Sequence, residues 1–125
     1  MNTRLAVVLM SLFATRALAH HAEAMFDRSA LLSSSGTVKE FLWANPHTLI
    51  YLAVSDASGA PHVVVFECGS ASVMKRDGWS RDTIKVGEKL TVSYYPRRDL
   101  KPGGMLATAT FADGTKLGWR TMGTP

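Results

Sequence analysis

Two adjacent histidines, His20 and His21, directly follow a stretch that has the features of a cleaved export signal. If a signal peptidase cuts before His20, that residue offers a free amine and an imidazole. These two nitrogens can chelate one metal ion, and an imidazole from elsewhere in the chain, such as that of His47, completes a set of three. Nitrogen donors of this kind bind Cu(II) strongly. The sequence therefore predicts a candidate metal site formed by His20, His21 and His47, and copper is the metal that suits it best.

Residues 1–19 carry the features on which this cleavage depends. Arg4 precedes the apolar stretch Leu5–Ala14, and Ala17-Leu18-Ala19 forms an A-x-A site. The apolar stretch is too short to span a bilayer. We therefore expect cleavage between Ala19 and His20, and a periplasmic or secreted protein that does not span the membrane.

Each histidine also has a simpler interpretation. His20 and His21 can lie in solvent on a flexible arm, or the arm can pack on the domain through its apolar residues, Met25 and Phe26, without a ligand. His47 follows Asn45-Pro46 and can hydrogen-bond across a sheet instead of binding a metal.

Cys68 is the single cysteine, so the chain cannot form an internal disulfide. Its apolar neighbours favour a buried thiol, and strand alternation places Glu67 on the opposite face. We expect Glu67 to meet a backbone amide or a cation such as Arg76 or Arg81. No P-loop, H-E-x-x-H, C-x-x-C or G-x-S-x-G pattern occurs, so we do not expect an enzyme.

The formal net charge is +4, and removal of Arg4 and Arg16 with the signal lowers it to +2. This is weak evidence for nucleic acid, which we do not expect as a partner of an exported protein. Arg97, Arg98 and Lys101 form a local basic cluster that can face an anionic glycan or an acidic protein, although such clusters are commonly just solvated.

The pattern along the chain positions these residues on short strands. Alternation and turn signals predict strands over Gly36–Trp43, His47–Val54, Pro61–Cys68, Glu88–Tyr95, Met105–Phe111 and Lys116–Trp119. Ser70 can cap a two-turn helix that ends at Asp77, before Gly78. This order predicts an all-β fold with one short helix, an OB-type small β-barrel, with an open β-sandwich as the alternative. The expected organisation is a signal peptide over 1–19, an arm over 20–35 and a barrel domain over 36–125.

Several motifs together resemble a family of small exported bacterial proteins catalogued as a domain of unknown function. They are His20-His21, Met25-Phe26-Asp27, the segment Gly36–Phe41, Asn45-Pro46-His47 and Arg76-Asp77-Gly78-Trp79. The resemblance covers essentially the whole mature chain. It implies export, one small β-rich domain and signature positions at the N-terminal histidines and at Asn45-Pro46-His47, and it implies no activity.

Three functions remain as alternatives. The first is an exported module that binds a ligand or a metal, with copper at the mature N-terminus. The second is an interaction or accessory module for a periplasmic protein, without metal. The third is an OB domain that binds an anionic polymer through the Arg97–Lys101 loop.

Overall fold

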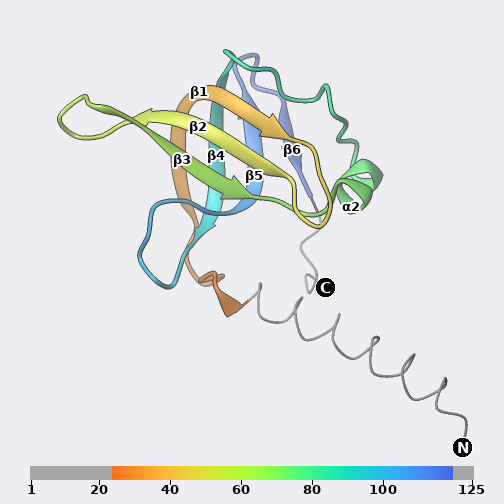
Figure 1. Cartoon of the computed structure of the whole chain (residues 1–125), viewed down its shortest axis with the longest axis horizontal. Helices are drawn as coiled ribbons and strands as arrows, with labels where there is room; N and C mark the ends of the chain where they lie inside the picture. The colour runs from red at the N-terminus through yellow and green to blue at the C-terminus, as the bar shows by residue number, and fades with distance from the viewer. Residues whose placement is uncertain (1–23, 120–125) are drawn as a thin grey trace, which may run out of the picture.

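The structure is a computed structural model, and it describes residues 24–119. Six strands and one helix follow one another along this part of the chain (Figure 1). They are β1 (Leu32–Leu42), β2 (Leu49–Ser55), β3 (Pro61–Glu67), α2 (Ala71–Arg76), β4 (Lys89–Pro96), β5 (Gly104–Phe111) and β6 (Lys116–Gly118). No helix in residues 24–119 is long and apolar enough to cross a membrane.

The sheet closes on itself. Its strand order is β3-β2-β1-β4-β5-β6, and an additional parallel pairing joins β3 to β5. In this pairing Phe66 lies beside Gly104 and Glu67 beside Met105. The first five strands therefore form a closed barrel, and α2 lies between β3 and β4 in the chain, as the OB-type prediction requires. That prediction is confirmed, and the open sandwich is excluded because β3 and β5 are paired.

Strand β1 takes part in both halves of the barrel. Its first half pairs with β4 and its second half with β2, and the change of partner falls at Gly36 and Thr37. A Cβ atom at Gly36 would overlap the backbone carbonyl oxygen of Ala53. Glycine is needed there because the two strands approach closely as β1 bends.

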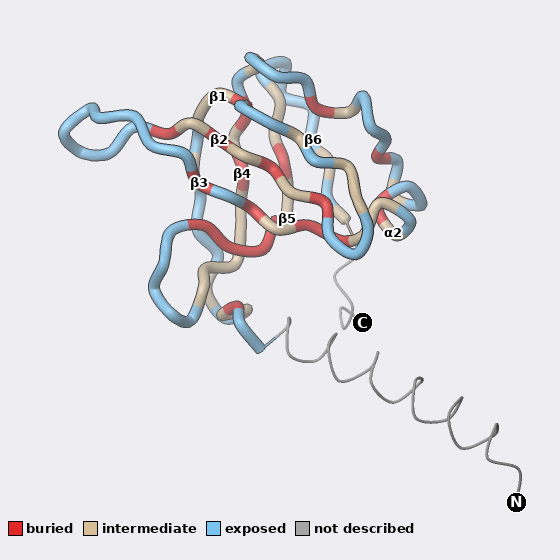
Figure 2. The backbone as a smooth tube through the Cα atoms, in the orientation of Figure 1, coloured by how far each residue is buried: buried red, intermediate tan, exposed pale blue. Residues whose placement is uncertain are grey.

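The core lies inside the barrel and follows the predicted alternation. On β2, Ile50, Leu52 and Val54 are buried, and the preceding Thr48 is also buried (Figure 2). The Thr48 hydroxyl donates to the carbonyl oxygen of Ala44 at 3.3 Å, which satisfies this buried polar group. Burial of the apolar face is the main source of stability in such a small domain.

Helix α2 closes one end of the core. The Ser70 hydroxyl accepts a hydrogen bond from the Val73 amide at 3.2 Å, and Gly78 follows the helix with a φ of 91°. These are the predicted cap and the predicted stop. Met74 from the helix and Trp79 after it are both buried in the core cluster.

The barrel begins earlier in the chain than residue 36, the start predicted from the sequence. β1 begins at Leu32, so the boundary expected between residues 35 and 36 falls inside a strand. Ser33, Ser34 and Ser35 lack the apolar pattern of a strand, but they pair with β4, where the partners of Ser34 and Ser35 are the β-branched residues Val92 and Thr91. The expected signal segment, residues 1–19, lies outside the described residues.

Candidate functional site

His47 and Glu67 meet on the outer surface where β2 begins and β3 ends. The Thr48 amide donates to the Gly69 carbonyl oxygen at 2.9 Å, and the Cys68 amide donates to the Thr48 carbonyl oxygen at 2.8 Å. These bonds extend the ladder beyond the pair Leu49–Glu67. Thr48 and Cys68 both point into the core, so His47 and Glu67 are diagonal neighbours on the opposite, outward face.

The two side chains form a close polar contact. Nδ1 of His47 lies 3.1 Å from Oε1 of Glu67, with the side chains 43% and 28% exposed. The same Nδ1 lies 3.4 Å from the backbone carbonyl oxygen of Cys68. A carboxylate and a carbonyl oxygen accept hydrogen bonds and do not donate them, so Nδ1 carries the proton. In the neutral imidazole, Nε2 is then the nitrogen with a free lone pair.

The loop before His47 is fixed to the helix. Oδ1 of Asn45 accepts from the Ser72 amide at 3.3 Å and from the Ser72 hydroxyl at 3.4 Å. The Ala71 amide donates to the Ala44 carbonyl oxygen at 3.0 Å. The first turn of α2 therefore holds the segment that presents His47.

A second ion pair lies close to Glu67. The Arg97 guanidinium donates to both carboxylate oxygens of Asp99, at 2.9 and 2.7 Å. This pairing raises the pKa of Arg97, to which the charge of Glu67 also contributes. The hydrogen bond from Arg97 lowers the pKa of Asp99 to about 2. The carboxylate of Glu67 therefore lies within electrostatic range of both His47 and a cation.

The segment that leads back to the N-terminal histidines is anchored beside Arg97. Phe26 is 2% exposed and forms a β-bridge with Arg97. The Asp27 amide donates to the Pro96 carbonyl oxygen at 2.8 Å, and the Arg98 amide donates to the Met25 carbonyl oxygen at 2.9 Å. Of the two residues through which the arm was expected to pack, Phe26 does pack on the barrel, whereas Met25 is exposed.

Of the three predicted metal ligands, the structure describes one, His47. His47 is on the surface, whereas His20 and His21 lie outside the described residues. Within residues 24–119 no group of three or more His, Cys, Asp or Glu side chains is arranged to hold a metal ion. Any three-ligand site at His47 must take donors from outside that range.

The expected partners of Glu67 were wrong, because His47 occupies the position that we assigned to Arg76 or Arg81. The contact follows from the strand register, which aligns Leu49 with Glu67 and places His47 diagonally beside it, and the sequence pattern alone does not specify that register. The other prediction for this region holds. Cys68 is 2% exposed, and burial raises the pKa of its thiol, which disfavours a nucleophilic thiolate.

The aromatic residues near the basic loop are engaged in packing. The rings of Tyr94 and Phe66 lie 4.8 Å apart, and those of Trp43 and Phe41 lie 5.9 Å apart. The Arg28 guanidinium lies 5.6 Å from the centre of the Tyr95 ring. Trp43, Tyr94 and Tyr95 are half-buried, and each of these rings has one such neighbour.

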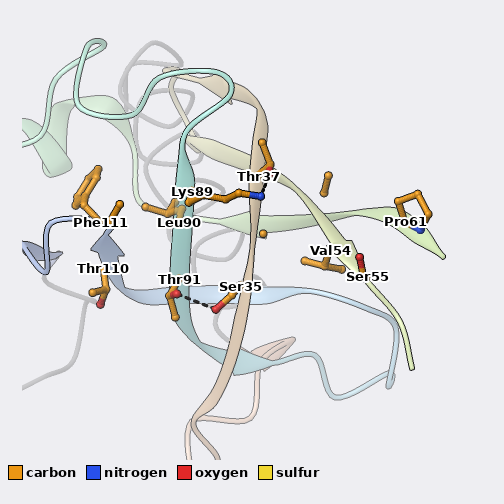
Figure 3. Close-up of a pocket in the computed structure, with 13 residues that line it drawn as sticks. Ser35, Thr37, Val54, Ser55, Pro61, Lys89, Leu90, Thr91, Thr110 and Phe111 are labelled. Atoms are coloured by element: carbon orange, nitrogen blue, oxygen red, sulfur yellow. Dashed lines mark hydrogen bonds between the residues drawn. The ribbon is translucent and has the colours of Figure 1, made fainter. Parts of the chain in front are cut away.

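A surface groove that was not predicted from the sequence lies on the barrel away from His47 and Glu67. It has a volume of about 520 Å³, and β1, β2, β4 and β5 contribute to its lining. Figure 3 shows Lys89 reaching from β4 toward Thr37, and the hydroxyls of Ser35 and Thr91 in contact. The serine and threonine residues that line the groove are spread over four strands, so they form no motif by which the sequence could have predicted it.

The family comparison agrees with the resemblance in the sequence. The model of a family of unknown function, DUF6152, matches residues 8–107. The chain belongs to this family. No curated protein and no solved structure matches it. Family membership therefore assigns no activity to the barrel or to the His47–Glu67 pair.

Proposed function

We propose that this DUF6152 protein is an exported binding module that holds a transition-metal ion, with copper preferred, at the end of the barrel where His47 lies. The ligands in this proposal are Nε2 of His47 together with the amine and imidazole of His20, and His21 is an additional donor. The single observation that carries the proposal is the 3.1 Å contact between Nδ1 of His47 and Glu67.

That contact matters because it resembles the surroundings of metal-bound imidazoles in general. A ligating histidine commonly donates its other ring N–H to a carboxylate or a backbone carbonyl, which fixes the ring and raises its basicity. His47 meets both kinds of acceptor through Nδ1. Its side chain is also 43% exposed, so the ring is accessible from outside the barrel.

The anchoring of Phe26 supports the participation of His20. His20 lies six positions before Phe26, and an extended chain covers about 3.3–3.6 Å per residue, so His20 can reach about 20 Å from Phe26. Phe26 is bridged to Arg97, whose cation is within electrostatic range of Glu67. In this proposal, that reach brings the nitrogens of His20 to His47.

Donor chemistry favours copper over other ions in this proposal. The proposed set consists of imidazole and amine nitrogens, and copper lies at the top of the divalent affinity series for nitrogen sites. Calcium and magnesium prefer oxygen ligands, which this set does not supply.

The experiment requires protein purified after export, because the proposed site needs an unblocked N-terminus. Intact mass first establishes whether the chain starts at His20. Cu(II) affinity is then measured by competition with a chelator for four forms: the native protein, a form with one glycine added before His20, His47→Ala and His62→Ala. We expect weaker binding in the extended form and in His47→Ala. His62 is exposed on β3 and serves as the matched control.

Equal Cu(II) affinity in the native and extended proteins would overturn the role of the His20 amine. A start at Glu23 would remove both N-terminal histidines and would have the same consequence. Binding should also weaken as pH falls, because protons compete for the same nitrogens.

The second candidate function is a metal-free interaction module for a periplasmic protein or a small ligand. The observation in its favour is the outer face of β3, where Val63 and Val65 are 52% and 38% exposed. Leu42 on β1, two strands away in the same sheet, is also exposed. Unlike the metal site, such a surface tolerates an added N-terminal residue. Failure of the copper experiment would leave this function ahead.

A further inference from the structure

The groove of Figure 3 is lined by hydroxyl groups in register across three strands. Ser35 on β1 pairs with Thr91 on β4, and Thr91 pairs with Thr110 on β5. Neighbouring strands lie about 4.8 Å apart, so the backbones of these three residues span about 10 Å. The hydroxyls of Ser35 and Thr91 are 2.7 Å apart, and each can still offer an acceptor to a bound molecule.

One cation lies beside this row of hydroxyls. The Lys89 ammonium donates to the Thr37 hydroxyl at 2.8 Å, and an ammonium has three donor hydrogens. The residues that line the groove include no aspartate or glutamate. The groove thus combines the positive charge of Lys89, whose hydrogen-bond partner Thr37 is neutral, with several neutral hydrogen-bond donors and acceptors.

We propose that this groove binds a small hydroxylated carboxylate of the sugar-acid type. A carboxylate carries one negative charge, which matches the one ammonium that lines the groove. A phosphate carries more charge and is commonly bound by several cations or by a row of backbone amides. The hydroxyl row matches the hydroxyls of a polyol, because both kinds of group donate and accept.

The apolar part of the lining fits the same ligand. Pro61 at the start of β3 is exposed and Phe111 is half-buried, so both present apolar surface to the groove, whereas Val54 and Leu90 are buried in the core beneath it. Sugar acids have apolar C–H surfaces between their hydroxyls, and binding sites combine apolar walls with a few placed polar groups. The groove is separate from the His47–Glu67 pair, since neither residue lines it.

The experiment is a titration of the ¹⁵N-labelled mature protein, without added metal, followed by amide chemical shifts. The probes are galacturonate, the neutral sugar galactose and inorganic phosphate. We expect galacturonate to shift the amides of Ser35, Thr37 and Thr91 in a saturable way. Galactose and phosphate should each bind at least about tenfold more weakly, because galactose lacks the carboxylate and phosphate lacks the polyol hydroxyls.

Variants separate the proposed site from general surface binding. Lys89→Met should weaken galacturonate binding at least about tenfold, because it removes the charged donor and keeps the aliphatic stem. Lys85→Met makes the same change at an exposed residue outside the groove, and it should leave the affinity unchanged. His47→Ala should also leave it unchanged, so the result is independent of the copper proposal.

The proposal is overturned if galacturonate produces no saturable shifts at these residues. It is also overturned if galactose or phosphate binds equally well, or if Lys89→Met binds as the native protein does. Circular dichroism of Lys89→Met shows whether the barrel is intact, and Thr91→Val provides a second, uncharged test of the same site. We expect Thr91→Val to weaken galacturonate binding as well. Unchanged binding in both variants would mean that the row of hydroxyls stabilises the sheet and does not bind a ligand.

Discussion

His47 and Glu67 contact each other through Nδ1 and Oε1 at 3.1 Å, although twenty residues separate them in the chain. The register of β2 and β3 produces this contact, because it aligns Leu49 with Glu67 and leaves His47 one diagonal step away on the same face. The carboxylate orients the imidazole, and the backbone carbonyl of Cys68 accepts from the same nitrogen. If the ring binds a metal, Glu67 acts on the metal through His47.

The first prediction follows from this arrangement and rests on the proposed copper site. Glu67→Ala should lower the Cu(II) affinity of the native protein by about 10- to 100-fold, the range found when a partner of a ligating histidine is removed. Competition with a chelator measures it. Glu40→Ala is the control, because Glu40 is an exposed carboxylate on β1 of the same sheet. Equal losses in both variants would indicate a general charge effect.

The sequence predicted the barrel well because each strand carries its own local signal. Alternation along β2 places Ile50, Leu52 and Val54 on one face, which is the face that the structure buries, and Ser70 and Gly78 marked the ends of the helix. The closure of the barrel could not be predicted from the alternation of apolar residues. It depends on the pairing of β3 with β5, which joins residues about forty positions apart and has no periodic signature. The early start of β1 was missed because its serines form a strand only through their partners on β4.

The candidate site was predictable only in part. His47 was identified from its residue type, but its pairing with Glu67 depends on the β2–β3 register, which a one-residue change would abolish. The hydroxyl groove depends on the register of three strands at once. Single serines and threonines on strands carry no distinguishing signal until that register is known.

The second prediction concerns the buried thiol. Cys68 should react slowly with a thiol reagent such as Ellman's reagent at neutral pH, because burial both shields the sulfur and raises its pKa. Absorbance follows the reaction with and without denaturant. An exposed thiol for comparison comes from Ser58→Cys in a Cys68→Ala background, and comparable rates for the two folded proteins would contradict the burial.

The third prediction is a pH dependence of stability. The Arg97 hydrogen bond lowers the Asp99 pKa from 3.8 to about 2, so the folded state favours the ionised carboxylate. This contribution is present above about pH 4 and is lost as the pH falls toward 2. Asp99→Asn should therefore show a smaller decrease in the free energy of unfolding over this range.

Denaturant unfolding at several pH values measures this difference. Asp82→Asn changes an exposed aspartate elsewhere on the surface and provides the control. The Asp99 side chain is itself solvent-accessible, so the effect should be modest and should shrink with added salt. An Asp99→Asn protein with the native pH profile would show that the ion pair does not contribute.

The fourth prediction concerns the loop between β4 and β5. Leu100 is 92% exposed and has a φ of 63°, a left-handed conformation that is unfavourable for a residue with a side chain. Leu100→Gly should therefore raise the free energy of unfolding by up to about 1 kcal/mol, partly offset by the greater freedom of glycine in the unfolded chain. Thermal or denaturant unfolding measures the change, and a clear loss of stability would mean that the Leu100 side chain makes a stabilising contact.

Gly103 in the same loop gives a matched comparison of opposite sign. Its φ is 93°, and a Cβ atom there would overlap the carbonyl oxygen of Val65. Gly103→Ala should lower the free energy of unfolding by about 1–3 kcal/mol, because both the backbone conformation and the close approach to β3 are disturbed.

The fifth prediction tests the packing of the C-terminal strand against the turn before α2. A Cβ atom at Gly69 would lie 2.7 Å from Cζ3 of Trp119, and the Trp119 indole N–H donates to the Leu106 carbonyl oxygen at 2.8 Å. The ring is therefore held in place and cannot move aside without losing that bond. Gly69→Ala should lower the free energy of unfolding by about 1–3 kcal/mol and shift the tryptophan fluorescence. In a Trp119→Leu background the same substitution should cost clearly less, and equal costs in the two backgrounds would show that Gly69 and Trp119 are not coupled.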